Sequence, residues 1–162
     1  MATTESGAEV QVAPAERLIP VRRREDALGA SREAQRLGQL FGLGKKRAAE
    51  LAIVVSELGS NIAKYGVQGE IGLSFDTDGL GTVRVVARDV GPPFQNLEIA
   101  LTDGCNDRGP IDPADILGRR GLGTGLGAVL RLADQFECRQ DAGGKEITVH
   151  LRREPATGRR RT

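Results

Sequence analysis

Hydrophobic residues recur with a helical period along one central segment, Leu51–Gly66 (LAIVVSELGSNIAKYG). Spacings of i, i+4, i+7 and i+11 place four aliphatic side chains on one helix face, namely Leu51, Val55, Leu58 and Ile62. Other apolar residues occupy much of the remaining circumference, so we expect burial on more than one side. The sequence therefore predicts a core helix that starts near Lys45 and ends at Gly66.

The same patterning predicts the elements on either side of this helix. The expected strands are Glu16–Arg24, Gly69–Asp76, Thr82–Arg88, Gln135–Gln140 and Glu146–Arg152. The other expected helices are Glu25–Phe41 and Gly125–Asp134, with short ones around Asn96–Thr102 and Pro113–Leu117. Turns are expected at Asp78-Gly79 and Gly143-Gly144, and Pro20 favours a sheet edge for the first strand.

This order of elements predicts the fold class. It places the helices on one face of a mixed, mostly antiparallel sheet, which is a two-layer α/β sandwich of the α+β class. A chain of 162 residues suits one domain, which we expect over residues 16–153. We expect residues 1–15 to be a disordered leader and residues 154–162 a basic tail.

Composition excludes several classes of protein. The formal charge of +1 gives no general attraction to nucleic acid or to anionic membranes, and no apolar run is long enough to span a bilayer. We therefore expect a soluble, cytoplasmic protein. Cys105, Cys138 and His150 lack the spacing of a metal site, so we expect reduced thiols and a solvated or edge histidine in the last strand.

Two polar residues stand one turn apart on the central helix, Glu57 and Asn61. They could form a paired couple at the edge of the core, or face a cleft and hold a cation or a water. Asp89 follows the most apolar strand and precedes Gly91, in the run Asp-Val-Gly-Pro-Pro. That run fits an ordinary turn or a carboxylate that faces a ligand.

Glycines concentrate in Gly118–Gly127 (GRRGLGTGLG), directly before an expected helix. Their open backbone and the helix terminus would suit an anion, although a flexible hinge has the same composition. A P-loop would need a Gly-Lys-Ser/Thr ending, and a dinucleotide fingerprint would need a preceding strand. Neither is present in this stretch of sequence.

Taken together and in this order, these motifs resemble the boxes of the GHKL ATPase superfamily, which has the Bergerat fold. The phrases SELGSNIAKYG, ARDVGPP, LTDG and GLGTGLGAVLRLADQFE are similar to one branch of it. That branch comprises the stand-alone bacterial serine/threonine kinases of sigma-factor control, with the stressosome switch kinases nearest and the anti-sigma-factor kinases next. The resemblance covers about Arg17 to Arg153.

The resemblance implies a role for each matching position. Asn61 would hold the Mg²⁺ that bridges the ATP phosphates, and Glu57 would be the general base for the attacking hydroxyl. Asp89 would accept a hydrogen bond from the adenine amino group, and Gly91 would let the ring approach. Lys64 would neutralise phosphate charge. The phosphate loop would comprise Gly121, Gly123, Thr124, Gly125, Leu126 and Gly127.

By this resemblance the chain would be an ATP- and Mg²⁺-dependent serine/threonine kinase acting on STAS-domain antagonist proteins. A downstream regulator or a sigma factor would be a second partner, a homodimer is left open, and neither a membrane nor nucleic acid is expected. The alternative is a non-catalytic anti-sigma or partner-binding module on the same fold. A DNA-associated ATPase domain fits less well, because the transducer domain of such machines is missing.

Two departures from the family pattern concern the nucleotide site. Pro93 stands where the first glycine box normally ends in glycine, so we expect a stiffer loop beside the nucleotide. The segment from Asp103 to Arg120, which would form the lid, is longer than in the nearest relatives. A longer lid could contact a partner or slow catalysis.

Overall fold

The computed structural model describes residues 16–76, 81–102, 105–106, 109–110 and 125–153. The main strands are β1 (Glu16–Val21), β2 (Gly69–Phe75), β3 (Thr82–Asp89), β6 (Gln135–Asp141) and β7 (Gly144–Arg152). The helices are α1 (Arg24–Phe41), α2 (Lys45–Tyr65), α3 (Leu97–Ala100) and α5 (Leu126–Leu132). A separate pair of two-residue strands, β4 (Cys105–Asn106) and β5 (Gly109–Pro110), was not predicted.

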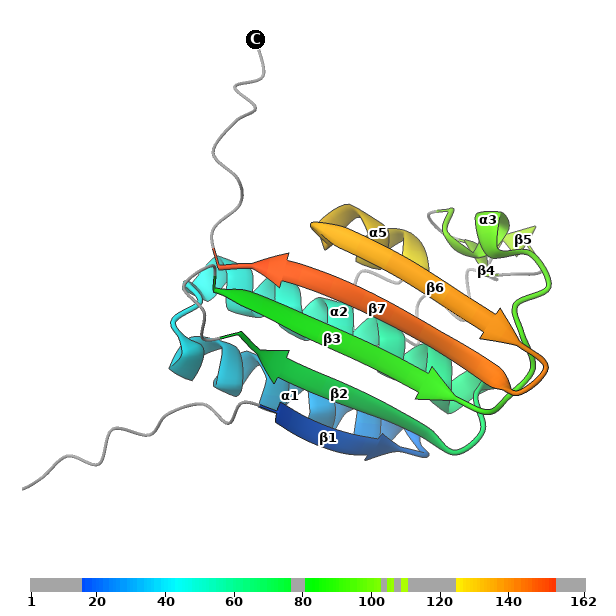
Figure 1. Ribbon diagram of the computed structural model, residues 1–162, viewed down its shortest axis with the longest axis horizontal. Helices are drawn as coiled ribbons and strands as arrows, with labels where there is room; N and C mark the ends of the chain where they lie inside the picture. The colour runs from blue at the N-terminus through cyan, green and yellow to red at the C-terminus, as the bar shows by residue number, and fades with distance from the viewer. Residues whose placement is uncertain (1–15, 77–80, 103–104, 107–108, 111–124, 154–162) are drawn as a thin grey trace, which may run out of the picture.

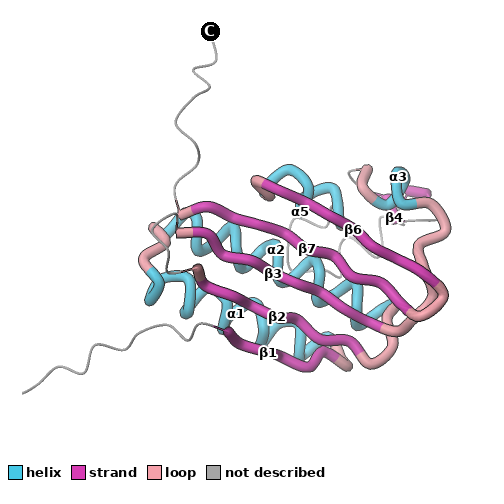
Figure 2. The backbone as a smooth tube through the Cα atoms, in the orientation of Figure 1, coloured by secondary structure: helices cyan, strands magenta, loops and turns pink. Residues whose placement is uncertain are grey.

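The main strands form one sheet in the order β1-β2-β3-β7-β6, and each neighbouring pair is antiparallel. Helices α1, α2 and α5 lie on one face of this sheet (Figure 1), and the backbone tube shows the same two layers (Figure 2). The two-layer α+β sandwich predicted from the sequence is therefore confirmed. The edge position expected for β1 is confirmed as well.

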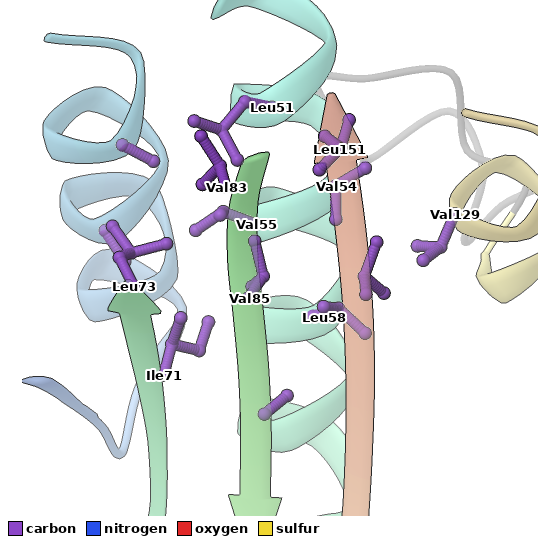
Figure 3. Close-up of a cluster of buried hydrophobic side chains, with 14 of the residues drawn as sticks. Leu51, Val54, Val55, Leu58, Ile71, Leu73, Val83, Val85, Val129 and Leu151 are labelled. Carbon is purple, nitrogen blue, oxygen red and sulfur yellow. The ribbon is translucent and has the colours of Figure 1, made fainter. Parts of the chain in front are cut away.

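The core lies between α2 and the covered face of the sheet. The predicted stripe of α2 is buried, with Leu51 and Val55 at 0% exposure and Leu58 at 1%. These side chains meet alternate residues of the strands, and Val129 of α5 closes the cluster on one side (Figure 3). Leu51–Gly66 is thus the central core helix that its periodicity predicts.

The first strand is shorter than expected. It ends at Val21 because the N–H groups of Arg22 and Arg23 donate to the carboxylate of Asp26, which turns the chain into α1. The expected β6–β7 turn is shifted by one residue, because Asp141 pairs with Gly144 and the turn is Ala142-Gly143. The short helix α3 is confirmed over Leu97–Ala100 only.

Some expectations lie elsewhere or outside the described residues. His150 is half-buried in β7, an inner strand between β3 and β6, so the prediction of an edge position is wrong. The leader, the tail, the Asp78-Gly79 turn and the helix expected around Pro113–Leu117 lie outside the described residues. Among the described helices, none has the length and apolar character needed to cross a membrane.

Candidate functional site

Asp89 is the last residue of β3 and lies on the covered side of the sheet. Its position follows from the strand period, because Val83, Val85 and Ala87 on the same face are all core residues. It is 8% exposed, and its Oδ1 accepts hydrogen bonds from Gly91 N–H at 2.8 Å and Lys145 Nζ at 3.0 Å. A buried carboxylate therefore faces the end of the central helix, and its contact with a ligand stays a prediction.

Two glycines bring backbone close to this carboxylate. A Cβ added at Gly66, where α2 ends, would lie 3.0 Å from Asp89 Cγ. A Cβ added at Gly91 would lie 2.7 Å from Asp89 Oδ1 and 3.1 Å from the Tyr65 carbonyl oxygen. Any larger residue at either position would push the surrounding backbone away from Asp89. The packing around Gly91 thus requires glycine by itself, and the approach of an adenine ring to Gly91 stays a prediction.

Glu57, Asn61 and Lys64 all lie on α2, at i, i+4 and i+7, and so share one face of the helix. Glu57 and Asn61 are half-buried, and Lys64 is exposed. Asn61 precedes Gly66 by five residues, or about 7.5 Å of helix rise, so these side chains extend along α2 away from Asp89. A ligand that contacts Asp89 with one end could therefore meet Asn61 and Glu57 with the other.

The glycine-rich segment is only partly described. Gly121, Gly123 and Thr124 lie outside the described residues. Gly125 has φ 65° and ψ −145°, a backbone conformation that favours glycine. Leu126 is 4% exposed and belongs to the core, and Gly127 is buried in the first turn of α5. Leu126 could therefore contribute only backbone to a ligand, and the phosphate-loop assignment stays a prediction.

The loop that contains Pro93 is hydrogen-bonded to strands β6 and β7 beside the turn that joins them. Lys145 Nζ donates to the Pro92 carbonyl oxygen at 2.6 Å, and the Gln140 side chain accepts from Phe94 N–H at 2.9 Å. Pro93 itself is exposed. The stiffness expected from two prolines is therefore reinforced by contacts to β6 and β7.

Lys145 was missed by the sequence analysis, which began the last strand at Glu146. The structure begins β7 at Gly144, and Lys145 shares the buried face with Ile147, Val149 and Leu151. It is 7% exposed. A lysine in phase with the apolar positions of a strand is the signal that could have found it, since a buried ammonium needs an anionic partner.

A hollow of about 760 Å³ opens around the β6–β7 turn, and both Asp89 and Lys145 are among the residues that line it. Its charged residues include Arg88, which pairs with Glu146 at 2.7 Å and with Glu70 at 3.8 Å on the helix-free face of the sheet. The hydrogen bond to Glu146 raises the pKa of the Arg88 guanidinium above its ordinary value. Because Arg88, Glu70 and Glu146 pair with one another, they offer less to a ligand than Asp89, which lines the same hollow.

The candidate site offers Asp89 Oδ2 to an adenine amino group and the Asn61 amide oxygen to a magnesium ion. Within the described residues, both hydrogen bonds to the carboxylate end on Oδ1, which leaves Oδ2 for an amino group. No cluster of three acidic, histidine or cysteine side chains is found there, so a Mg²⁺ at the Asn61 amide oxygen would take its other ligands from phosphates and water.

The chain thus combines an open antiparallel sheet, a helix layer on one face and a strand-end carboxylate framed by glycines. The chain belongs to the family of histidine kinase-like ATPase domains, whose sequence model matches residues 21–151.

One relative of known sequence and one solved structure are similar to this chain. Over 124 residues the chain is 31% identical to the protein named serine/threonine-protein kinase RsbT of Bacillus subtilis (strain 168), covering 75% of this chain and 85% of that one. It also resembles the crystal structure of the RsbU and RsbW domains of Rv1364c from Mycobacterium tuberculosis, with a TM-score of 0.58 and 15% identity. The match covers 86% of this chain and 32% of the longer solved chain, and it supports the fold alone.

Proposed function

We propose that this chain is an ATP- and Mg²⁺-dependent protein serine/threonine kinase of a bacterial stress or sigma-factor switch. The observation that carries the proposal is the buried Asp89 carboxylate at the end of β3, beside the helix that bears Glu57 and Asn61. The similarity to RsbT supports the kinase class. The proposed substrates are STAS-domain antagonist proteins, phosphorylated on serine or threonine.

Each residue has a defined part in the proposed reaction. Asp89 accepts a hydrogen bond from the adenine amino group, and this bond orients the nucleotide along α2. Asn61 holds the metal ion, which when bound neutralises charge on the phosphates. Glu57 accepts the proton of the attacking hydroxyl, and for this it must come within hydrogen-bond reach of the protein substrate. Positioning supplies most of the catalysis in phosphoryl transfer, so the helix layer is the part that must be rigid.

The substitution Glu57→Gln tests the catalytic step. We expect ATP binding to persist, because the amide keeps the size of the side chain, and phosphoryl transfer to fall about 100-fold or more through loss of the base. Transfer of labelled γ-phosphate to recombinant STAS-domain proteins measures the rate, and titration calorimetry measures ATP binding. Glu137→Gln, on the exposed edge strand β6, is the matched control and should leave both unchanged.

The same calorimetry separates the proposal from its rival. Wild-type chain should bind Mg-ATP in the micromolar range, about −7 to −8 kcal/mol, and Asp89→Asn or Asn61→Ala should weaken it. ATP binding with no transfer to any STAS-domain protein would favour a non-catalytic partner-binding module. Absence of ATP binding would rule out the kinase.

A further inference from the structure

The buried partner of Asp89 is the ammonium group of Lys145. Register pairs the two residues across β3 and β7, and their side chains are 6% and 5% exposed. Lys145 Nζ lies 3.0 Å from Asp89 Oδ1 and 2.6 Å from the Pro92 carbonyl oxygen. Burying two charges costs several kcal/mol unless their remaining hydrogen-bonding capacity is used, so the unused capacity of this pair points to a ligand.

That unused capacity is one donor and one acceptor. An ammonium has three N–H groups, and two of those of Lys145 have oxygen acceptors. In the described part of the chain, the third has only the Phe94 ring, whose centroid lies 5.5 Å from Nζ and is a weak partner. On Asp89, Oδ1 accepts from both Gly91 N–H and Lys145, and Oδ2 receives no donor from the described residues.

We propose that Lys145 determines base specificity together with Asp89, by donating a hydrogen bond to ring nitrogen N1 of adenine while Asp89 Oδ2 accepts from the adjacent 6-amino group. This inference rests on the proposed nucleotide-binding function. Adenine carries a donor and an acceptor side by side on this edge, which complements the pair. Without Lys145 the site would recognise the amino group alone.

The same pair rejects bases that carry a carbonyl at position 6. Guanine and hypoxanthine have an oxygen at position 6 and an N–H at position 1. In the same orientation the oxygen would face the carboxylate and the N–H would face the ammonium, so two buried groups would be mismatched. A site built to hydrogen-bond a ligand discriminates strongly against such a mismatch, because its own polar groups are left unpaired.

The first test uses nucleotide analogues on the wild-type chain, so it requires no variant to fold. Titration calorimetry compares ATP with 1-deaza-ATP, in which a C–H replaces N1, and with ITP, all with Mg²⁺. Loss of a hydrogen bond to a charged donor predicts about 10- to 100-fold weaker binding of 1-deaza-ATP. ITP should bind more weakly still, because both of its edge atoms are mismatched.

The second test links the effect to the lysine. In Lys145→Met the affinity ratio of ATP to 1-deaza-ATP should fall to about one, because N1 has lost its donor. Lys46→Met, at an exposed position near the start of α2, is the matched control and should keep the wild-type ratio. Because Lys145→Met leaves Asp89 without its charged partner, circular dichroism is used to check that this variant is folded.

Two results would overturn the inference. One is equal affinity of the wild-type chain for ATP and 1-deaza-ATP. The other is tighter ATP binding by Lys145→Met at an unchanged ratio, which would mean that the lysine blocks the base instead of contacting it. Either leaves the proposed kinase standing, since ATP still binds. Failure of the wild-type chain to bind ATP at all would overturn the proposed function and the inference together.

Discussion

Asp26 decides where β1 ends and α1 begins. Its Oδ2 accepts hydrogen bonds from the N–H groups of Arg22 at 2.9 Å and Arg23 at 3.0 Å, which satisfies donors that an unfinished helix start would leave open. These hydrogen bonds, that of Arg22 first, hold the pKa of the Asp26 carboxyl below its ordinary value. The chain therefore bends at Arg22 and Arg23 to enter α1, and these two arginines do not extend β1.

Asp26→Ala should lower the melting temperature at pH 7 by a few degrees. Because the pKa of Asp26 is depressed in the folded chain, its stabilising contribution is present above the ordinary carboxyl pKa and is lost as the pH falls through the folded value. The melting temperatures of the two chains should therefore converge as the pH falls below the ordinary carboxyl pKa.

Glu25→Ala is the control for Asp26, because it removes a neighbouring carboxylate of the same first turn. It should lower the melting temperature less. If the two alanine variants melted alike across the pH range, the hydrogen bonds of Asp26 would not be what stabilises the helix start.

Between elements, Gly59 sets the distance between α1 and α2. A Cβ added there would lie 2.8 Å from Ala27 Cβ and 3.1 Å from Ala27 Cα, so the two helices touch through their smallest residues. The contact also positions α2, since α1 is the helix that packs along it (Figure 1). The angle at which Glu57 and Asn61 face the site depends on that packing.

Gly59→Ala should destabilise the chain by about 1–3 kcal/mol, because the added methyl group clashes with backbone and forces the helices apart. Gly29→Ala is the matched control on α1. In the described part of the chain, no other element has an atom within 4 Å of a Cβ at Gly29, and alanine is the better helix former, so it should stabilise by up to about 1 kcal/mol. Urea denaturation measures both, and opposite signs are expected.

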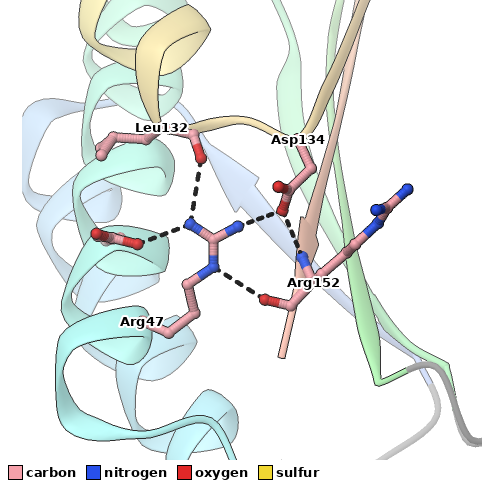
Figure 4. Close-up of polar contacts among 5 residues, drawn as sticks. Arg47, Leu132, Asp134 and Arg152 are labelled. Carbon is pink, nitrogen blue, oxygen red and sulfur yellow. Dashed lines mark hydrogen bonds and ion pairs between the residues drawn. The ribbon is translucent and has the colours of Figure 1, made fainter. Parts of the chain in front are cut away.

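Across the whole molecule, Arg47 joins three elements that are distant in sequence (Figure 4). Its guanidinium donates to the Arg152 carbonyl oxygen at 2.9 Å, to the Leu132 carbonyl oxygen at 3.3 Å and to both Glu50 and Asp134. Asp134 also accepts from Arg152 N–H at 2.7 Å. The start of α2, the end of α5 and the end of β7 are thus held by one side chain that is 12% exposed.

Arg47→Met should lower the free energy of unfolding by about 2–4 kcal/mol, because the Glu50 carboxylate and two carbonyl groups lose this donor and Asp134 loses its charged partner. Arg139→Met is the matched control. Arg139 is 74% exposed and, among the residues that the structure describes, pairs only with Glu137 on the same strand, so its loss should change stability by less than about 1 kcal/mol. Equal effects in urea denaturation would contradict a central role for Arg47.

The sequence by itself determined the elements and the identity of most candidate site residues. Helical period and strand alternation depend on neighbours a few positions apart, so α1, α2 and the main strands could be located within a few residues. Asp89 was identified because it directly follows an apolar strand and precedes Gly91. These signals are local, so they can be recognised in the sequence before the fold is known.

The tertiary structure alone decided what faces Asp89. Lys145 lies 56 positions away, and it reaches the carboxylate only because β7 inserts between β3 and β6 with a register that pairs these two residues. The contacts of Arg47 with Leu132 and Arg152 span 85 and 105 positions for the same reason. Strand order and register are set by packing of the whole core. Two residues that pair across neighbouring strands therefore have no fixed separation in the sequence, and the sequence alone does not predict the pair.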